Sequence, residues 1–248
     1  MGLYREARYR TAGDRAVVAQ FGDEIGLEVN HRVRAMAQEI ESGRLEGVTE
    51  TLPSYSVLYV FYDPLKVSYG QVLEGLRGIE GRLEQVVLSP PRVFIIPTLY
   101  GGEMGPDLED VASHAGLGVE EVVSIHSSVD YHVYFTGFTP GFLFLGGMSS
   151  RIATPRLENP RTRVPAGSVG IAGNQTGVYP IQSPGGWRLI GRTPVRLYDP
   201  ARPEPVLIRA GDKVRFRPMS DQEYQEISRR VKSGEYIMET LTEGGEVS

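Results

Sequence analysis

Apolar residues follow two different rhythms in the first part of the chain. Over residues 25–42 they recur every three or four positions, which predicts a helix with one buried face; its apolar positions are Val33, Met36, Ala37 and Ile40. Residues 56–62 are β-branched or aromatic, and this composition predicts a buried strand. Asp63-Pro64 ends that strand, because proline lacks the N–H that a strand needs.

A second helix is predicted from Ser68. Gln71 stands three residues later, as a capping box requires, and the apolar stripe that follows is Val72, Leu73, Leu76 and Ile79. Shorter strands are expected at 4–10, 16–20 and 48–52. Strands covered by two helices predict a small α+β domain, ferredoxin-like in type, over residues 1–88.

Ser89-Pro90-Pro91 is the best candidate for a linker, because consecutive prolines stiffen the chain and interrupt strand pairing. A second domain is expected over residues 92–235. Residues 236–248 are expected to form a tail, frayed over 243–248.

The second domain opens with a predicted strand at 92–98 that ends at Pro97. Asp107 is expected to cap a short helix that Gly116 stops, and another helix is expected at 119–127. From residue 130 turn signals recur every 8–12 residues, which is typical of a β-barrel or sandwich. A strand at 213–217 and a helix capped by Ser220 complete the domain.

Composition narrows the function classes. The 248 residues carry a net charge of −5, which does not favour nucleic-acid binding. No cysteine is present, so disulfides, thiolate catalysis and cysteine metal sites are excluded. No apolar run is long enough for a membrane span, and the charged N-terminus is unlike a signal peptide. We therefore expect a soluble cytoplasmic protein without nucleic-acid or membrane partners.

Glycine and proline are concentrated between residues 137 and 194. The dense segments are 137–142, 164–177, 183–187 and 190–194. Such segments form tight barrel turns, or they bring backbone amides close to a ligand, and both interpretations stay open. Neither a P-loop nor a Gly-x-Gly-x-x-Gly segment is present, so a nucleotide would be bound in another way.

Charge in this region is one-sided. Residues 151–192 contain six arginines, opposed within the segment by Glu158 alone. Arginine clamps carboxylate or phosphate groups, so an anion site is one interpretation; a solvated rim or an interface with an acidic partner is the other. The adjacent Asn174-Gln175-Thr176 adds neutral hydrogen-bonding groups.

The candidates for acid–base chemistry are Glu103, Asp107, His126 and His132. Helix capping is the simpler role for Asp107. Both histidines lie among apolar neighbours, which favours buried core residues over catalysts. Ser168 stands in Ala-Gly-Ser-Val-Gly, which is not a nucleophile elbow, and no ligand cluster predicts a metal.

The glycine- and proline-rich segments make the chain recognisable. The sequence resembles the family of the 5-oxoprolinase B subunits, also called the KipI or allophanate-hydrolase-subunit-1 family. The resemblance is carried by Tyr100-Gly101-Gly102-Glu103, the segments 137–142 and 164–177, and Ile190–Pro194. The resemblance also includes Phe21-Gly22-Asp23 and so covers nearly the whole chain.

This resemblance implies a small α/β domain followed by a cyclophilin-like β-barrel. It implies a subunit that works with partner subunits A and C in the ATP-dependent hydrolysis of 5-oxo-L-proline to L-glutamate, and that is inactive alone. ATP, with its accompanying Mg²⁺, is the implied cofactor. Two alternatives remain on the same scaffold: an inhibitor that binds a sensor histidine kinase, or a component of a urea or allophanate system.

We expect the site on the barrel, between the Glu103 turn and the segment 164–176, facing a partner subunit. Glu103 and His126 are the candidate catalytic residues. The residues expected to contact the substrate are Arg156, Arg163, Gly173, Gln175, Thr176 and Arg192.

Overall fold

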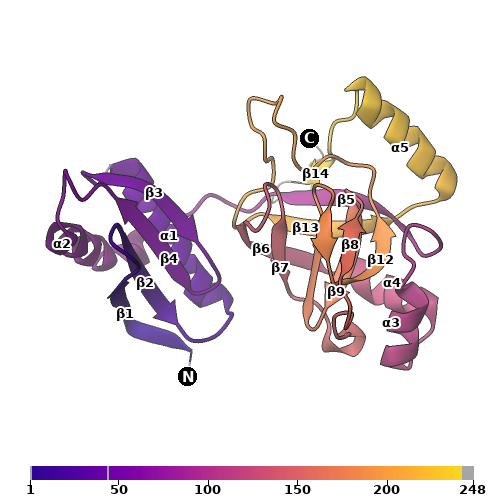
Figure 1. Ribbon diagram of the computed structural model, residues 1–248, viewed down its shortest axis with the longest axis horizontal. Helices are drawn as coiled ribbons and strands as arrows, with labels where there is room; N and C mark the ends of the chain where they lie inside the picture. Colours follow the sequence, from indigo (N-terminus) through magenta and orange to yellow (C-terminus); the bar gives the residue numbers. More distant parts are fainter. Residues whose placement is uncertain (1, 44, 242–248) are drawn as a thin grey trace. The chain divides into compact units, whose positions relative to one another are not determined.

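The computed structural model describes residues 2–43 and 45–241. The chain divides into two compact units, Met1–Ser89 and Pro90–Ser248 (Figure 1). None of the helices in the described ranges is long and apolar enough to cross a bilayer.

The first unit is a four-stranded antiparallel sheet with two helices. Its order along the chain is β1 (Leu3–Thr11), β2 (Ala16–Gly22), α1 (Leu27–Gly43), β3 (Val48–Pro53), β4 (Val57–Tyr62) and α2 (Tyr69–Glu80). The sheet order is β1-β2-β4-β3. The elements β2-α1-β3-β4-α2 follow the order of the first five elements of a ferredoxin-like β-α-β-β-α-β fold. The edge position that the sixth element, the last strand, occupies in that fold is taken here by β1.

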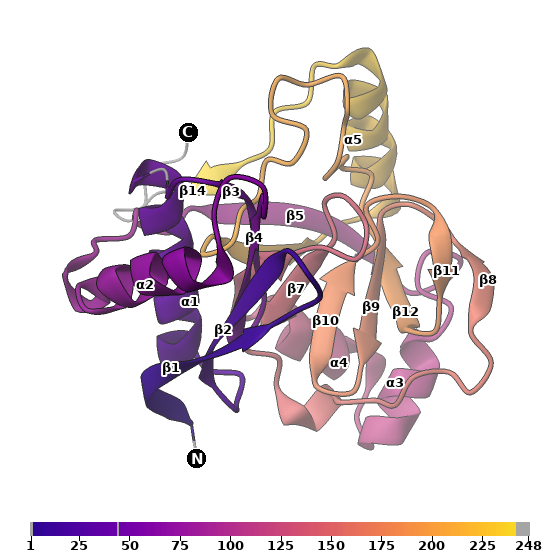
Figure 2. The same ribbon diagram turned by 60° about the vertical axis from the view of Figure 1, so that its left-hand side comes forward.

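Alternation along the two central strands puts one face of this sheet against both helices. Val17, Ala19 and Phe21 of β2 are buried with Leu58 and Val60 of β4 in one core that both helices share. Figure 2 shows the helices together with this sheet. The predicted capping box at Ser68 is confirmed, because its hydroxyl accepts the Gln71 N–H while the Gln71 side chain accepts the Ser68 N–H.

The second unit is built around a barrel. Its elements are β5 (Val93–Tyr100), α3 (Leu108–Ala115), α4 (Val119–Ser127), β6 (Asp130–Thr136), β7 (Leu143–Gly146), β8 (Arg161–Val164), β9 (Ser168–Ala172), β10 (Gln175–Val178), β11 (Ser183–Gly185), β12 (Arg188–Arg192), β13 (Lys213–Pro218), α5 (Asp221–Ser233) and β14 (Thr240–Leu241). Within the described ranges, seven of these strands close in the order β12-β9-β10-β7-β6-β13-β5, and β5 pairs back to β12. The expected barrel is thus confirmed.

The barrel core is filled by alternate residues of its strands. Val169 and Ile171 of β9 and Val214 and Phe216 of β13 belong to it. The strand β5 continues past Pro97, where the sequence predicted its end. It does so because its edges pair with β13 in parallel and, at Leu99 and Tyr100, with β12.

Part of the expected tail packs on the barrel. Met238 is buried in the barrel core, and Thr240–Leu241 forms β14 against the start of β5. Burial of the apolar Met238 side chain stabilises the packing of this segment on the barrel. Residues 242–248, which include the fraying predicted for 243–248, lie outside the described residues.

Candidate functional site

A second apolar cluster lies outside the barrel core, between the barrel wall and the two-stranded sheet β8–β11. It consists of Phe142, Val164, Ala172, Tyr179, Trp187 and Leu189. The Phe142 ring lies edge-on to Trp187 and to Tyr179, with centroids 5.5 and 5.7 Å apart. Figure 2 shows β8 and β11 beyond β12, on the outer side of the wall. We call this the outer cluster.

Buried polar atoms without a protein partner gather around the outer cluster. In the described part of the chain they are Thr139 Oγ1, Arg161 Nη1, Ser168 Oγ, Ser183 Oγ and Arg192 Nε. Burying a polar atom without a hydrogen bond is costly, so each such atom requires an explanation. All five residues lie between positions 137 and 194, where glycine, proline and arginine are concentrated in the sequence.

Two of these atoms come from neighbouring strands. Ser168 of β9 stands opposite Arg192 of β12 in the antiparallel register. Opposite residues of an antiparallel pair point to the same side of the sheet. Because Val169 faces the barrel core, Ser168 and Arg192 face outward, toward the side of the outer cluster. A hydroxyl and a guanidinium on one face are a donor set for an anionic oxygen.

Gly167 lets the two strands approach at this point. Its φ is +81°, and a Cβ built there would overlap the Thr193 carbonyl oxygen. No other residue type fits such a contact, so this glycine is required by the packing of the loop before β9.

Asp107 anchors the neighbouring loops. The carboxylate Oδ1 accepts a 2.7 Å hydrogen bond from Arg161 Nη2, and Oδ2 accepts the Leu189 N–H at 2.6 Å. Asp107 occupies the N-cap position of α3, but its side chain makes no capping hydrogen bond. The capping role predicted for Asp107 is therefore wrong: a charged partner and a strand amide compete for the carboxylate more strongly than the helix end does.

His126 lies inside the barrel. Its ring is fully buried, with Nδ1 2.7 Å from the Tyr100 hydroxyl and Nε2 2.8 Å from Thr176 Oγ1. Burial lowers the pKa of His126 to about 3, so the ring is neutral near pH 7. Both ring nitrogens of His126 have protein partners, so His126 and Thr176 are core residues in this structure. The apolar neighbours of His126 in the sequence favoured such a buried histidine.

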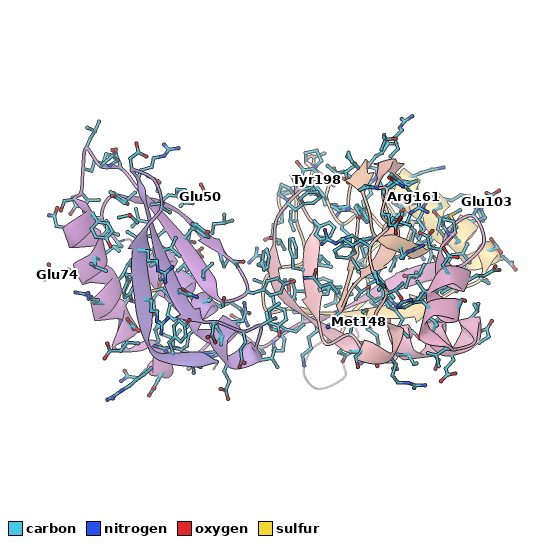
Figure 3. The ribbon with its side chains drawn as sticks, turned by 60° about the horizontal axis from the view of Figure 1, so that its bottom comes forward. Glu50, Glu74, Glu103, Met148, Arg161 and Tyr198 are labelled. Carbon is cyan, nitrogen blue, oxygen red and sulfur yellow. The ribbon has the colours of Figure 1, made fainter. Side chains whose placement is uncertain are left out.

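The remaining residues of the expected site lie on the outside. Glu103 is exposed in the turn after β5, at the margin of the unit in Figure 3, and Gly173 is exposed in the turn between β9 and β10. Gln175 precedes the inward Thr176 and so faces outward. Arg163 is exposed on β8. The expected set is thus divided between the barrel interior and its outer face.

The six arginines divide into two groups. Arg151, Arg161 and Arg188 are neutralised by Glu121, Asp107 and Asp110, which lie outside the 151–192 segment. For Arg156, the guanidinium carbon lies 6.0 Å from the centre of the Trp187 ring. Arg156, Arg163 and Arg192 have no salt bridge to a described carboxylate, so within the described residues their positive charges are not neutralised. In the described residues no group of three or more His, Asp or Glu could hold a metal ion.

Comparison with known proteins agrees with this architecture. Residues 7–208 match the family described as carboxyltransferase domain, subdomain C and D. The 5-oxoprolinase B subunit of Bacillus subtilis is 48% identical over 86% of this chain and 92% of that protein. A urea amidolyase of Lachancea kluyveri is 26% identical over 94% of this chain but only 14% of its own length.

A solved structure shows the same fold. The crystal structure of TTHA0988 matches 83% of this chain with a TM-score of 0.74 and 42% identity. The present chain spans only 40% of that chain. In that relative the same fold is therefore continuous with a longer polypeptide.

Proposed function

The chain belongs to the carboxyltransferase subdomain C and D family and, within it, to the 5-oxoprolinase B subunits, and on this premise we propose that it is the B subunit of an ATP-dependent 5-oxoprolinase. The observation that carries the proposal is the likeness to the Bacillus subtilis protein along nearly its whole length. The reaction is 5-oxo-L-proline, ATP and water to L-glutamate, ADP and phosphate. A subunit of this type works with partner subunits A and C in the cytoplasm.

The substrate sets the chemistry that the site has to provide. Its carboxylate is anionic, and its lactam is a stable amide that water opens only after activation. ATP, with Mg²⁺, supplies that activation by phosphorylating the amide oxygen, and we propose that a partner subunit holds or shares it. The residues of this chain hold the negative charge that the substrate brings and that develops at the amide oxygen.

Arg192 is the centre of the proposed anion site. Its Nε is buried without a protein partner beside the equally unpartnered Ser168 hydroxyl, so both are ready to donate to an anionic oxygen. Arg156 adds charge beside Trp187 of the outer cluster, and Arg163 adds charge from the exposed side of β8. Gln175 faces outward after the Gly173 turn. Glu103, exposed in its turn, is proposed to orient the ligand or to exchange a proton at the interface with the partner.

The proposal is tested by reconstitution. The chain is purified alone and with subunits A and C of the same organism, and glutamate and ADP release are measured. The isolated chain should be inactive and the complex active. Full turnover by the isolated chain would contradict the subunit role.

The site is tested in the same complex. Arg192→Ala and Arg163→Ala should each lower the turnover rate by about 10²–10³-fold, as for other preorganised charged groups. Glu103→Gln should also lower it. Arg151→Ala is the matched control, because Arg151 is paired with Glu121 and should leave the rate near wild type. If the first three variants assemble, melt normally and turn over like the control, the site lies elsewhere.

Two other functions are separated by one further experiment. Affinity capture from the native cytoplasm should recover the A and C subunits. Recovery of a sensor histidine kinase instead would favour the inhibitor function. The urea-type system is tested by comparing glutamate release from 5-oxoproline with ammonia release from urea or allophanate. We expect glutamate release only, since this chain is only distantly similar to a urea amidolyase.

A further inference from the structure

Phe138 is held outward by an unusual backbone. Its side chain is 73% exposed, and its φ is +65°, the only positive φ of a non-glycine residue among residues 2–43 and 45–241. The Thr139 N–H donates to the Gly137 carbonyl oxygen at 2.8 Å, which closes a three-residue turn around Phe138. Such turns with positive φ are rare and strained for a bulky side chain.

The surrounding loop is closed and backed, so the strain is maintained. Residues 137–142 join β6 to β7, and hydrogen bonds from Gly137 N–H to Phe142 O and from Phe142 N–H to Thr139 O lock the loop. At Gly141 a Cβ would lie 2.9 Å from Cβ of Tyr198, so the loop rests directly on residues 197–198. Figure 3 labels Tyr198 in the barrel unit. Strain that the surroundings maintain is typical of functional surfaces.

Phe138 stands above an aromatic base. Its ring lies edge-on to Phe142, which is buried in the outer cluster, with centroids 5.7 Å apart. On the neighbouring strands Phe135 and Phe144 stack at 4.1 Å, and Phe144 packs against the same cluster. An exposed aromatic residue on a rigid aromatic base is the form of an interface anchor.

We infer that Phe138 is the anchor by which this chain docks a partner subunit, whose surface offers an apolar pocket rimmed by acidic side chains. This inference rests on the proposed function. We infer an apolar pocket on the partner because the exposed Phe138 ring is itself apolar. The acidic rim follows from charge. Arg156 lies over Trp187 of the outer cluster. Next to the residues on which Gly141 rests, Arg196 and Arg202 share the single carboxylate of Asp199, which leaves a net positive charge there.

The test uses the full chain and the C subunit of the same organism, with affinity measured by calorimetry. Phe138→Gly and Phe138→Asn should weaken binding by about ten- to a hundredfold. Both replacements tolerate positive φ, so the isolated chain should melt at the same temperature or higher. Leu65→Asn is the control, because Leu65 is a 95% exposed apolar residue of the first unit, and it should leave the affinity within about twofold.

Charge is tested separately. Binding of the wild-type chain should weaken as salt rises, and Arg196→Glu should lower the association rate by about tenfold. Binding that is indifferent to salt would overturn the acidic rim.

The outcomes distinguish the inference from the proposed function. If the wild-type chain binds the C subunit and forms an active complex, but the Phe138 variants bind equally well, the docking role alone is overturned. A lower melting temperature with unchanged affinity would make Phe138 a structural residue and overturn it too. If the wild-type chain binds neither partner subunit, the proposed function fails, and the inference fails with it.

Discussion

Asp107 and Arg161, 54 residues apart in the chain, are joined by a 2.7 Å hydrogen-bonded ion pair, and the second carboxylate oxygen of Asp107 accepts the Leu189 N–H. One buried side chain thus connects the start of α3, the strand β8 and the strand β12. Two of these elements contribute to the candidate site: β8 carries Val164 of the outer cluster, and β12 carries Leu189 of that cluster and the unpartnered Arg192.

Asp107→Asn should destabilise the barrel unit by about 1–3 kcal/mol. The amide keeps one acceptor but turns an N–H₂ toward a second donor, so a buried donor loses its partner. Urea unfolding followed by Trp187 fluorescence measures this, because Trp187 is the single tryptophan and lies in the outer cluster. Asp110→Asn is the control: Asp110 pairs with Arg188 at a site where its side chain is 63% exposed, and the loss should stay below about 1 kcal/mol. Equal losses would show that the Asp107 network carries no special stability.

His126 should make the barrel unit less stable in mild acid. The folded-state pKa is about 3 and the unfolded value about 6.5, so below pH 6.5 the unfolded chain binds a proton that the folded chain refuses. The stabilising contribution is therefore complete above pH 6.5 and falls by about 1.4 kcal/mol per pH unit toward pH 3.

The measurement is the unfolding free energy between pH 7 and pH 5 for the wild type and two variants. His126→Gln should remove most of the slope, while His114→Gln, at an exposed position, should keep it. A wild-type slope retained by His126→Gln would contradict the neutral buried histidine.

Glu80 should stabilise the edge strand β1 of the first unit. The carboxylate accepts the Ala7 N–H at 2.5 Å, the Tyr9 hydroxyl at 2.7 Å and Arg32 Nη2 at 3.1 Å. Glu80→Ala leaves these donors without their acceptor and should cost about 2–4 kcal/mol. Hydrogen exchange of the β1 amides should accelerate accordingly. Glu74→Ala, exposed on the same helix (Figure 3), should leave exchange unchanged, and similar exchange in both variants would argue against this role.

Gly167→Ala should be far more damaging than Gly173→Ala. Both glycines have positive φ, so both substitutions carry a conformational cost of about 1–2 kcal/mol. At Gly167 the added Cβ also collides with the Thr193 carbonyl oxygen, whereas at Gly173 nothing lies within 4 Å. We expect a loss of about 2–5 kcal/mol for the first variant. Comparable melting temperatures for the two would contradict the close approach.

Local patterns in the sequence predicted several helices and strands directly. The capping box at Ser68, the stripe of α1 and the strand β4 need only neighbours within a few residues, so they could be predicted directly. The glycine- and proline-rich segments likewise indicated the family and the region that carries the unpartnered polar atoms. These features are local in sequence, and their physical causes are local as well.

Tertiary structure alone decided how the barrel closes and which side chains meet. The strand β5 continues through Pro97 because two strands distant in sequence pair with it. The Asp107 carboxylate does not cap its helix but accepts hydrogen bonds from residues 54 and 82 positions away. His126 and Thr176 point into the barrel, while Arg192 and Ser168 point outward. Periodicity predicts that a strand alternates, but which face becomes the core is decided only when the sheet closes and buries one side.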